Sequence, residues 1–167
     1  LAPGNNGIET YCVATSGSTI YIGTDYFIWK STNYGNTWTL LPGWSNAINY
    51  IAIKGSTIYG AAGHFLYVSY DNGNNWVQRS SPNDSTYFTS IAVHGNYLYA
   101  STNNDGTSGS VLRSVDDGQT WATLFTVSDM LNNTIYNQVQ SLAFNGNIIY
   151  AGTVVSGVYI SPDLGTT

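Results

Sequence analysis

The chain has 167 residues, a formal net charge of −5 and only 8% charged residues, against about 25% in an average soluble domain. Its four basic residues, Lys30, Lys54, Arg79 and Arg113, are scattered, so the sequence lacks the clustered positive charge that nucleic acids or anionic membranes require. No run of 18 apolar residues is present, so we expect no membrane insertion. Low charge with abundant Asn, Ser, Thr, Gly and Tyr favours a secreted or cell-surface location.

In chain order, one hairpin phrase occurs four times. It consists of an apolar stretch, a Gly-Ser or Gly-Asn turn, and a second apolar stretch that ends in Tyr. The copies are residues 13–21, 51–59, 91–99 and 142–150. Glycine supplies the positive φ that a tight hairpin turn needs, so each phrase predicts two antiparallel strands.

A second phrase, an octet running from Ser to Trp, follows each hairpin. The octets are residues 31–38, 69–76 and 114–121, and a fourth begins at Ser161 and stops at the chain end. In an octet the Asp or Asn side chain accepts hydrogen bonds from the turn backbone, and Gly takes a positive φ. The structural residues are Ser31, Asn33, Gly35, Trp38, Ser69, Asp71, Gly73, Trp76, Ser114, Asp116, Gly118, Trp121, Ser161, Asp163 and Gly165.

These octets resemble the Asp-box, or BNR, repeat of sialidase-, sortilin- and xyloglucanase-type propellers. The first copy departs from the pattern with Asn33 in place of Asp, and the second has Asn75 in place of Thr. The resemblance implies an all-β fold, a β-propeller of four-stranded antiparallel blades. In the second repeat we expect strands at about 47–54, 56–62, 64–70 and 75–79.

We expect one propeller region over residues 1–167, with repeats at about 1–40, 41–80, 81–125 and 126–167. The last repeat lacks its fourth strand. Two explanations stay open: the chain is part of a larger propeller, or another subunit completes the blade. An open blade edge predicts self-association. Residues 101–110 and 125–136 are expected to be inserted loops, the first of them small, polar and flexible.

Asp-box repeats occur in enzymes and in non-catalytic proteins alike, so the resemblance alone implies no activity. A sialidase would need three arginines and a Tyr–Glu pair, but the chain has only Arg79, Arg113 and Glu9. The other carboxylates show no spacing that suggests a catalytic pair. His94 is expected to be a solvated turn residue, and two histidines, His64 and His94, with no nearby Cys or Glu argue against a metal site. We therefore predict no catalytic residues, no metal and no cofactor.

Exposed aromatic residues remain as candidate ligand contacts, because sugar rings stack on aromatic faces and form hydrogen bonds at their edges. We predict Tyr26, Trp44, Arg79 and Tyr87 as contacts for a glycan or protein ligand. The predicted function is a non-catalytic extracellular propeller for recognition, adhesion or scaffolding. The alternative is a propeller segment of a secreted glycoside hydrolase whose catalytic residues lie outside this chain.

Overall fold

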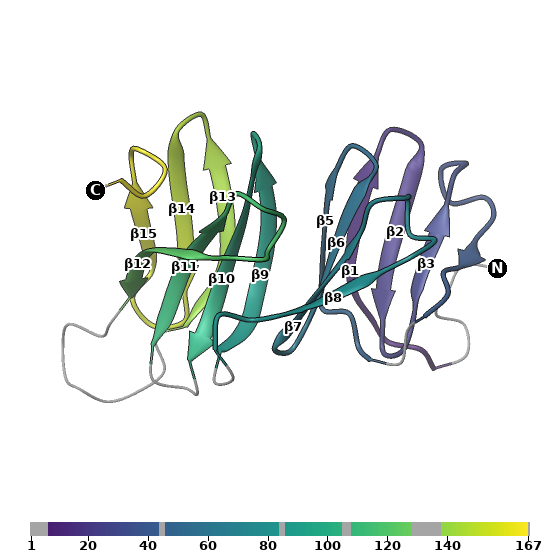
Figure 1. Ribbon diagram of the computed structural model, residues 1–167, viewed down its shortest axis with the longest axis horizontal. Coiled ribbons are helices and arrows are strands. Elements are labelled where there is room, and N and C mark those ends of the chain that lie inside the picture. The colour runs from purple at the N-terminus through teal and green to yellow at the C-terminus, as the bar shows by residue number, and fades with distance from the viewer. Residues whose placement is uncertain (1–6, 44–45, 84–85, 105–107, 128–137, 167) are drawn as a thin grey trace. The chain divides into compact units, whose positions relative to one another are not determined.

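The computed structural model describes residues 7–43, 46–83, 86–104, 108–127 and 138–166, and it contains fifteen β-strands in this part of the chain (Figure 1). The strands form four antiparallel sheets, here called A to D. The all-β fold class predicted from the sequence is confirmed. Where the chain is described, no helix is long and apolar enough to cross a membrane.

Sheets A and B lie in the first of two compact units, formed by residues 1–62 and 66–79. Each sheet is a simple up-and-down arrangement in chain order. Sheet A comprises β1 (Thr10–Ser16), β2 (Thr19–Thr24), β3 (Ile28–Ser31) and β4 (Thr39–Leu40). Sheet B comprises β5 (Tyr50–Lys54), β6 (Thr57–Ala62), β7 (Phe65–Ser69) and β8 (Val77–Ser80).

Sheets C and D lie in the second unit, formed by residues 63–65 and 80–167. Sheet C comprises β9 (Thr86–His94), β10 (Tyr97–Asn104), β11 (Gly109–Ser114) and β12 (Ala122–Val127). Sheet D comprises β13 (Val139–Asn145), β14 (Ile148–Thr153) and β15 (Val158–Ser161), with β14 between the other two. Its third strand therefore forms one edge of the described sheet.

Two-residue turns join the first two strands of every sheet, as the hairpin phrases predict. In sheet A the last paired residues before the turn are Ser16 and Thr19, and Gly17 has a φ of 60°. The corresponding glycines, Gly55, Gly95 and Gly146, also have positive φ. Each apolar phrase therefore folds back on itself and places its ending Tyr on the second strand.

The expectation of a flexible inserted loop at residues 101–110 is wrong for most of the segment. Strands β10 and β11 extend through Asn104 and from Gly109, and Ser101 and Thr102 are fully buried. The Thr102 hydroxyl donates a 3.3 Å hydrogen bond to the Ser110 carbonyl, and the hydroxyls of Ser110 and Thr126 are 3.0 Å apart. Small polar residues can thus form a strand where their hydroxyls bond across the ladder. Residues 105–107 and 128–136 lie outside the described parts.

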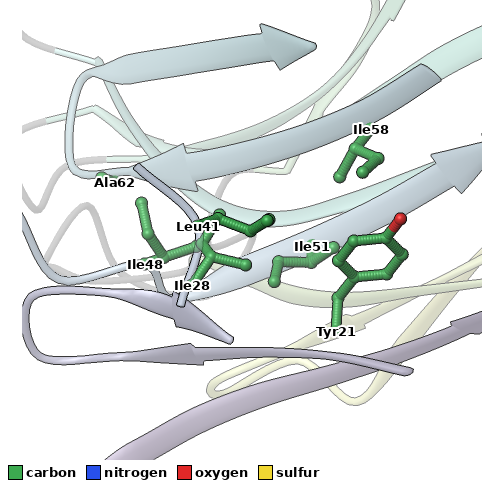
Figure 2. Close-up of a cluster of buried hydrophobic side chains, with 7 residues drawn as sticks. All are labelled: Tyr21, Ile28, Leu41, Ile48, Ile51, Ile58 and Ala62. Carbon is green, nitrogen blue, oxygen red and sulfur yellow. The ribbon is translucent and has the colours of Figure 1, made fainter. Parts of the chain in front are cut away.

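The core of the first unit lies between sheets A and B. Figure 2 shows its buried side chains, which come from both sheets and from the segments that join them: Tyr21, Ile28, Leu41, Ile48, Ile51, Ile58 and Ala62. Sheets A and B also join through the backbone, because Ile48 N donates a 3.0 Å hydrogen bond to the Thr24 carbonyl. Burying these side chains supplies the main favourable free energy of folding for this unit.

The second unit repeats this arrangement with sheets C and D. Its buried cluster joins Val111 and Val127 of sheet C to Val139 and Ala151 of sheet D. The backbones approach closely here, since a Cβ added to Gly109 would collide with Val139 N. In both units, an apolar residue at or just before the first strand of a sheet therefore covers the third strand of the preceding sheet.

Candidate functional site

Each octet turn is held by a network of side-chain and backbone hydrogen bonds. In the second octet, the Ser69 hydroxyl donates a 2.8 Å hydrogen bond to Asp71 Oδ1 and accepts a 2.8 Å bond from Gly73 N. Asp71 Oδ1 accepts a further bond of 2.8 Å from Asn75 N. Ser69 is fully buried, so its hydroxyl provides the partner that a buried backbone N–H requires. The network closes the link between β7 and β8.

The other octets have the same geometry. The serine hydroxyl accepts from the glycine N–H at 2.8, 2.7 and 2.8 Å in the octets of Ser31, Ser114 and Ser161. Asn33 functions here as Asp does, because its Oδ1 accepts from the Ser31 hydroxyl at 3.0 Å and from Thr37 N at 2.9 Å. Asn75 takes the place of Thr by donating a 2.7 Å bond from Nδ2 to Asp71 Oδ2.

Two consecutive residues of every octet have a left-handed backbone. The glycines have φ between 80° and 93°, and the residues before them, Tyr34, Asn72, Asp117 and Leu164, have φ between 56° and 59°. Only the glycine was anticipated from the sequence. Positive φ is unfavourable for a bulky side chain such as Leu164, so the serine and aspartate hydrogen bonds hold the backbone in this conformation.

Two of the octet carboxyl groups, Asp71 and Asp116, have lowered pKa values. Hydrogen bonds from the Asn75 side chain and backbone, and then from Ser69, lower the pKa of Asp71 to about 2. The Thr120 side chain, followed by its backbone N–H, lowers the pKa of Asp116 to about 2. Both groups are therefore ionised at neutral pH and bonded within their own turns, which suits a structural role rather than proton donation to a substrate.

Of the four predicted ligand contacts, Trp44 lies outside the described residues. Tyr26 is 59% exposed in the loop between β2 and β3, where its ring meets that of Phe27 edge-on at 6.3 Å. Arg79 lies on β8, and its Nη2 donates a 3.3 Å hydrogen bond to the Tyr70 hydroxyl. Tyr87 lies near the start of β9 and is 42% exposed. Tyr26 and Tyr87 thus occupy equivalent ends of their sheets, where the second strand passes to the third.

Tyr87 belongs to a cluster of rings and amides in the second unit. Its ring centroid lies 3.8 Å from that of His64, and His64 Nδ1 lies 2.9 Å from the Thr86 carbonyl oxygen. A carbonyl can only accept, so Nδ1 carries the proton and Nε2 of the neutral ring is an acceptor. Asn103 pairs directly with Tyr87 in the β9–β10 ladder. We call His64, Thr86, Tyr87, Asn103 and Asn104 the Tyr87 platform.

The platform is fixed by hydrogen bonds at its base. Thr86 Oγ1 lies 2.7 Å from Asn83 Oδ1 and 3.0 Å from Asn104 Oδ1. Phe88 N donates a 2.9 Å bond to the Gly63 carbonyl, which ties β9 to the segment that carries His64. The two rings are therefore held together before any ligand arrives, which reduces the entropy lost on binding.

Two exposed carboxylates that lie far apart in the sequence, Glu9 and Asp25, meet at the Tyr11 side chain. Both accept hydrogen bonds from the Tyr11 hydroxyl, at 2.6 Å to Asp25 Oδ1 and 3.0 Å to Glu9 Oε2. Glu9 N also donates a 3.1 Å bond to Asp25 Oδ2. Residues 16 positions apart meet because the β1–β2 ladder pairs Thr10 with Thr24. The hydrogen bonds to Asp25 and then Glu9 raise the pKa of Tyr11, so its phenol stays protonated.

His94 differs from the expected solvated turn residue. It ends β9, is half-buried, and stacks on Phe144 with ring centroids 4.7 Å apart and an interplanar angle of 9°. The aromatic partner comes from β13 of the neighbouring sheet, which the hairpin phrase by itself could not reveal. Within the described ranges, no group of three His, Cys, Asp or Glu side chains is placed to hold a metal ion.

Solved structures resemble this chain over nearly its whole length. The computationally designed Ika4 protein matches with a TM-score of 0.68 and 16% identity, over 96% of this chain and 94% of that one. The extracellular domain of the putative hybrid two-component system BT4673 from B. thetaiotaomicron matches with a TM-score of 0.70 and 19% identity. That match covers 90% of this chain and 20% of the other.

An ancestral GH74 enzyme, AFV00434, matches with a TM-score of 0.63 and 24% identity, over 95% of this chain and 23% of the enzyme. The chain thus spans about a fifth to a quarter of the latter two proteins. No protein-family model and no curated protein matches the sequence. The fold is a β-propeller fold with antiparallel blades, which confirms the predicted architecture.

Proposed function

We propose that this chain is a non-catalytic extracellular β-propeller that recognises carbohydrate, and that its octets are Asp-boxes that brace the blades. The observation that carries the proposal is the Tyr87 platform, in which an exposed tyrosine ring lies 3.8 Å from a histidine ring beside asparagine amides. An apolar C–H face of a sugar stacks on such rings, and its hydroxyls exchange hydrogen bonds with amides and with His64 Nε2.

The low content of charged residues, 8% of the chain, favours an uncharged ligand over a charged one. The net charge is −5, and the chain has only four basic residues. An uncharged glycan can form hydrogen bonds with the asparagine amides and stack on the aromatic rings, and neither interaction needs a charged side chain. The extracellular location proposed here is supported by the composition and by the resemblance to the extracellular domain of BT4673.

A glycan array on the whole chain, followed by calorimetry with the best ligand, tests the proposal. We expect Tyr87→Ala to weaken binding at least tenfold. Tyr97→Ala is the matched control, because Tyr97 is an exposed tyrosine at the opposite end of the same sheet. Equal loss in both variants, or no glycan bound by the wild type, contradicts the proposal.

The second candidate is a propeller segment of a secreted glycoside hydrolase with catalytic residues outside this chain. The resemblance to the GH74 enzyme favours it. A hydrolysis assay separates the two candidates. Binding without turnover supports the first; turnover that Glu9→Gln or Asp25→Asn abolishes would place catalysis within this chain and contradict both.

A further inference from the structure

The Tyr87 platform contains one side chain whose hydrogen-bonding role is dictated by the backbone. His64 lies in the turn between β6 and β7, and its Nδ1 is 2.9 Å from the carbonyl oxygen of Thr86, the first residue of β9. The carbonyl oxygen can only accept, so the single proton of the neutral imidazole resides on Nδ1. Thr86 itself is fixed, since its hydroxyl contacts the Asn83 and Asn104 side chains. His64 Nε2 is therefore restricted to accepting a hydrogen bond.

This acceptor is available to a ligand. His64 Nε2 has no hydrogen-bond partner in the part of the chain that the structure describes. The ring is half-buried, and Nε2 keeps contact with solvent. The imidazole and phenol centroids are 3.8 Å apart, so Nε2 borders the aromatic surface of Tyr87. A sugar ring that stacks at this surface carries its hydroxyls at its rim, where one of them can reach Nε2.

The other polar groups of the platform are less selective. Asn103 pairs with Tyr87 in the β9–β10 ladder, and Asn104 ends β10. Each amide has donors and an acceptor, and the hydroxyls of Tyr87 and Thr86 can also do both. Such groups can bond a hydroxyl or an ether oxygen of a ligand. The distinction between a free hydroxyl and a substituted one therefore depends on His64.

We propose that the Tyr87 platform selects a neutral glycan with a free hydroxyl beside the stacked C–H face, and that His64 sets this specificity. The inference rests on the function proposed above. A hydroxyl donates its proton to Nε2, whereas an O-methylated, O-acylated or fluorinated carbon offers acceptors only. Such a ligand removes Nε2 from solvent without giving it a partner, and the unpaired acceptor opposes binding.

Calorimetry on the whole chain tests the proposal with the best ligand from the glycan array and its monodeoxyfluoro analogues, each with one fluorine in place of one hydroxyl. We expect one analogue to bind the wild type about tenfold more weakly than the parent glycan, because its fluorine cannot donate to Nε2.

The variant His64→Phe keeps an aromatic ring against Tyr87 and removes the acceptor. In this variant the ratio of the two dissociation constants should fall to near one, whatever the change in overall affinity. The matched control is His94→Phe, the same substitution at a histidine that stacks on Phe144, and it should keep the wild-type ratio. Circular dichroism checks that both variants fold. A ratio that survives His64→Phe for every analogue overturns the proposal.

The tautomer of His64 can be measured in the wild type without any ligand. At a pH where the ring is neutral, the ring ¹⁵N chemical shifts should show a protonated Nδ1 and a bare Nε2. A proton on Nε2 overturns the specificity even if the glycan binds. Equal affinity of the wild type for the parent glycan and every analogue also overturns the specificity alone. An array on which no glycan binds overturns the proposed function and, with it, this inference.

Discussion

Ser69 and Asp71 are joined by a 2.8 Å hydrogen bond in which a fully buried hydroxyl donates to a carboxylate. The same hydroxyl accepts from Gly73 N, so one oxygen connects the side chain and backbone of the turn. The motif recurs in all four octets with nearly the same distances. This relationship explains why the repeat requires Ser at its start and Asp or Asn two residues later.

Ser69→Ala should destabilise the first unit by about 1–3 kcal/mol, because Gly73 N is left buried without a partner. Urea unfolding followed by tryptophan fluorescence measures the free energy of unfolding. Ser56→Ala, at an exposed hairpin turn in the same sheet, should change it by less than about 0.5 kcal/mol. Similar losses in both variants would contradict the role assigned to the buried hydroxyl.

The octet carboxylates should make stability depend on pH in the acid range. The pKa values of Asp71 and Asp116 fall from the usual 3.8 to about 2 on folding. The unfolded chain therefore binds more protons in this range, so the stabilisation is complete above pH 3.8 and is lost as pH falls toward 2.

The double variant Asp71→Asn, Asp116→Asn removes the two titrating groups, and Asn33 shows that Asn can form the same turn. Its unfolding midpoint in urea should change less between pH 4 and pH 2 than that of the wild type. An unchanged pH dependence would show that other groups are responsible.

Gly23 should tolerate no side chain, because a Cβ there would collide with the Ile48 carbonyl and would lie 2.6 Å from Cys12 Sγ. Gly23→Ala should lower the free energy of unfolding by about 1–3 kcal/mol, because the added methyl group overpacks the contact between sheets A and B. Gly152 has the equivalent position in sheet D, where the close neighbour is the rotatable Ser141 hydroxyl. Gly152→Ala should therefore lower the midpoint temperature of thermal unfolding by less than Gly23→Ala does. An equal decrease in both variants would contradict the packing described for Gly23.

Cys12 is the only cysteine and should report the opening of the first unit. Burial raises the pKa of its thiol to about 11, and its Sγ lies 3.5 Å from the Ile48 carbonyl. At pH 8 the thiolate fraction is then on the order of 0.1%, so the native protein should react slowly with a disulfide reagent. Reaction in urea should be far faster. Equal rates would show that the thiol is accessible in the folded chain.

The local features were predictable from the sequence because they depend on neighbouring residues. The hairpin turns follow from Gly-Ser and Gly-Asn, and the strands of the second repeat lie close to the expected positions. The non-local features were not predictable. Glu9 meets Asp25 only through the β1–β2 register, and His94 stacks on Phe144 from another sheet. Hydroxyl bonds across β10 and β11 turned an expected loop into strands.

The most direct test of carbohydrate recognition at the Tyr87 platform is an NMR titration that follows the imidazole ring protons. The chain has only two histidines, and His94 is packed against Phe144 away from the platform residues, so it serves as an internal reference. With the glycan identified on the array, we predict a saturable shift of the His64 signals and constant His94 signals. A glycan that binds while the His64 signals stay unchanged would contradict recognition at this site.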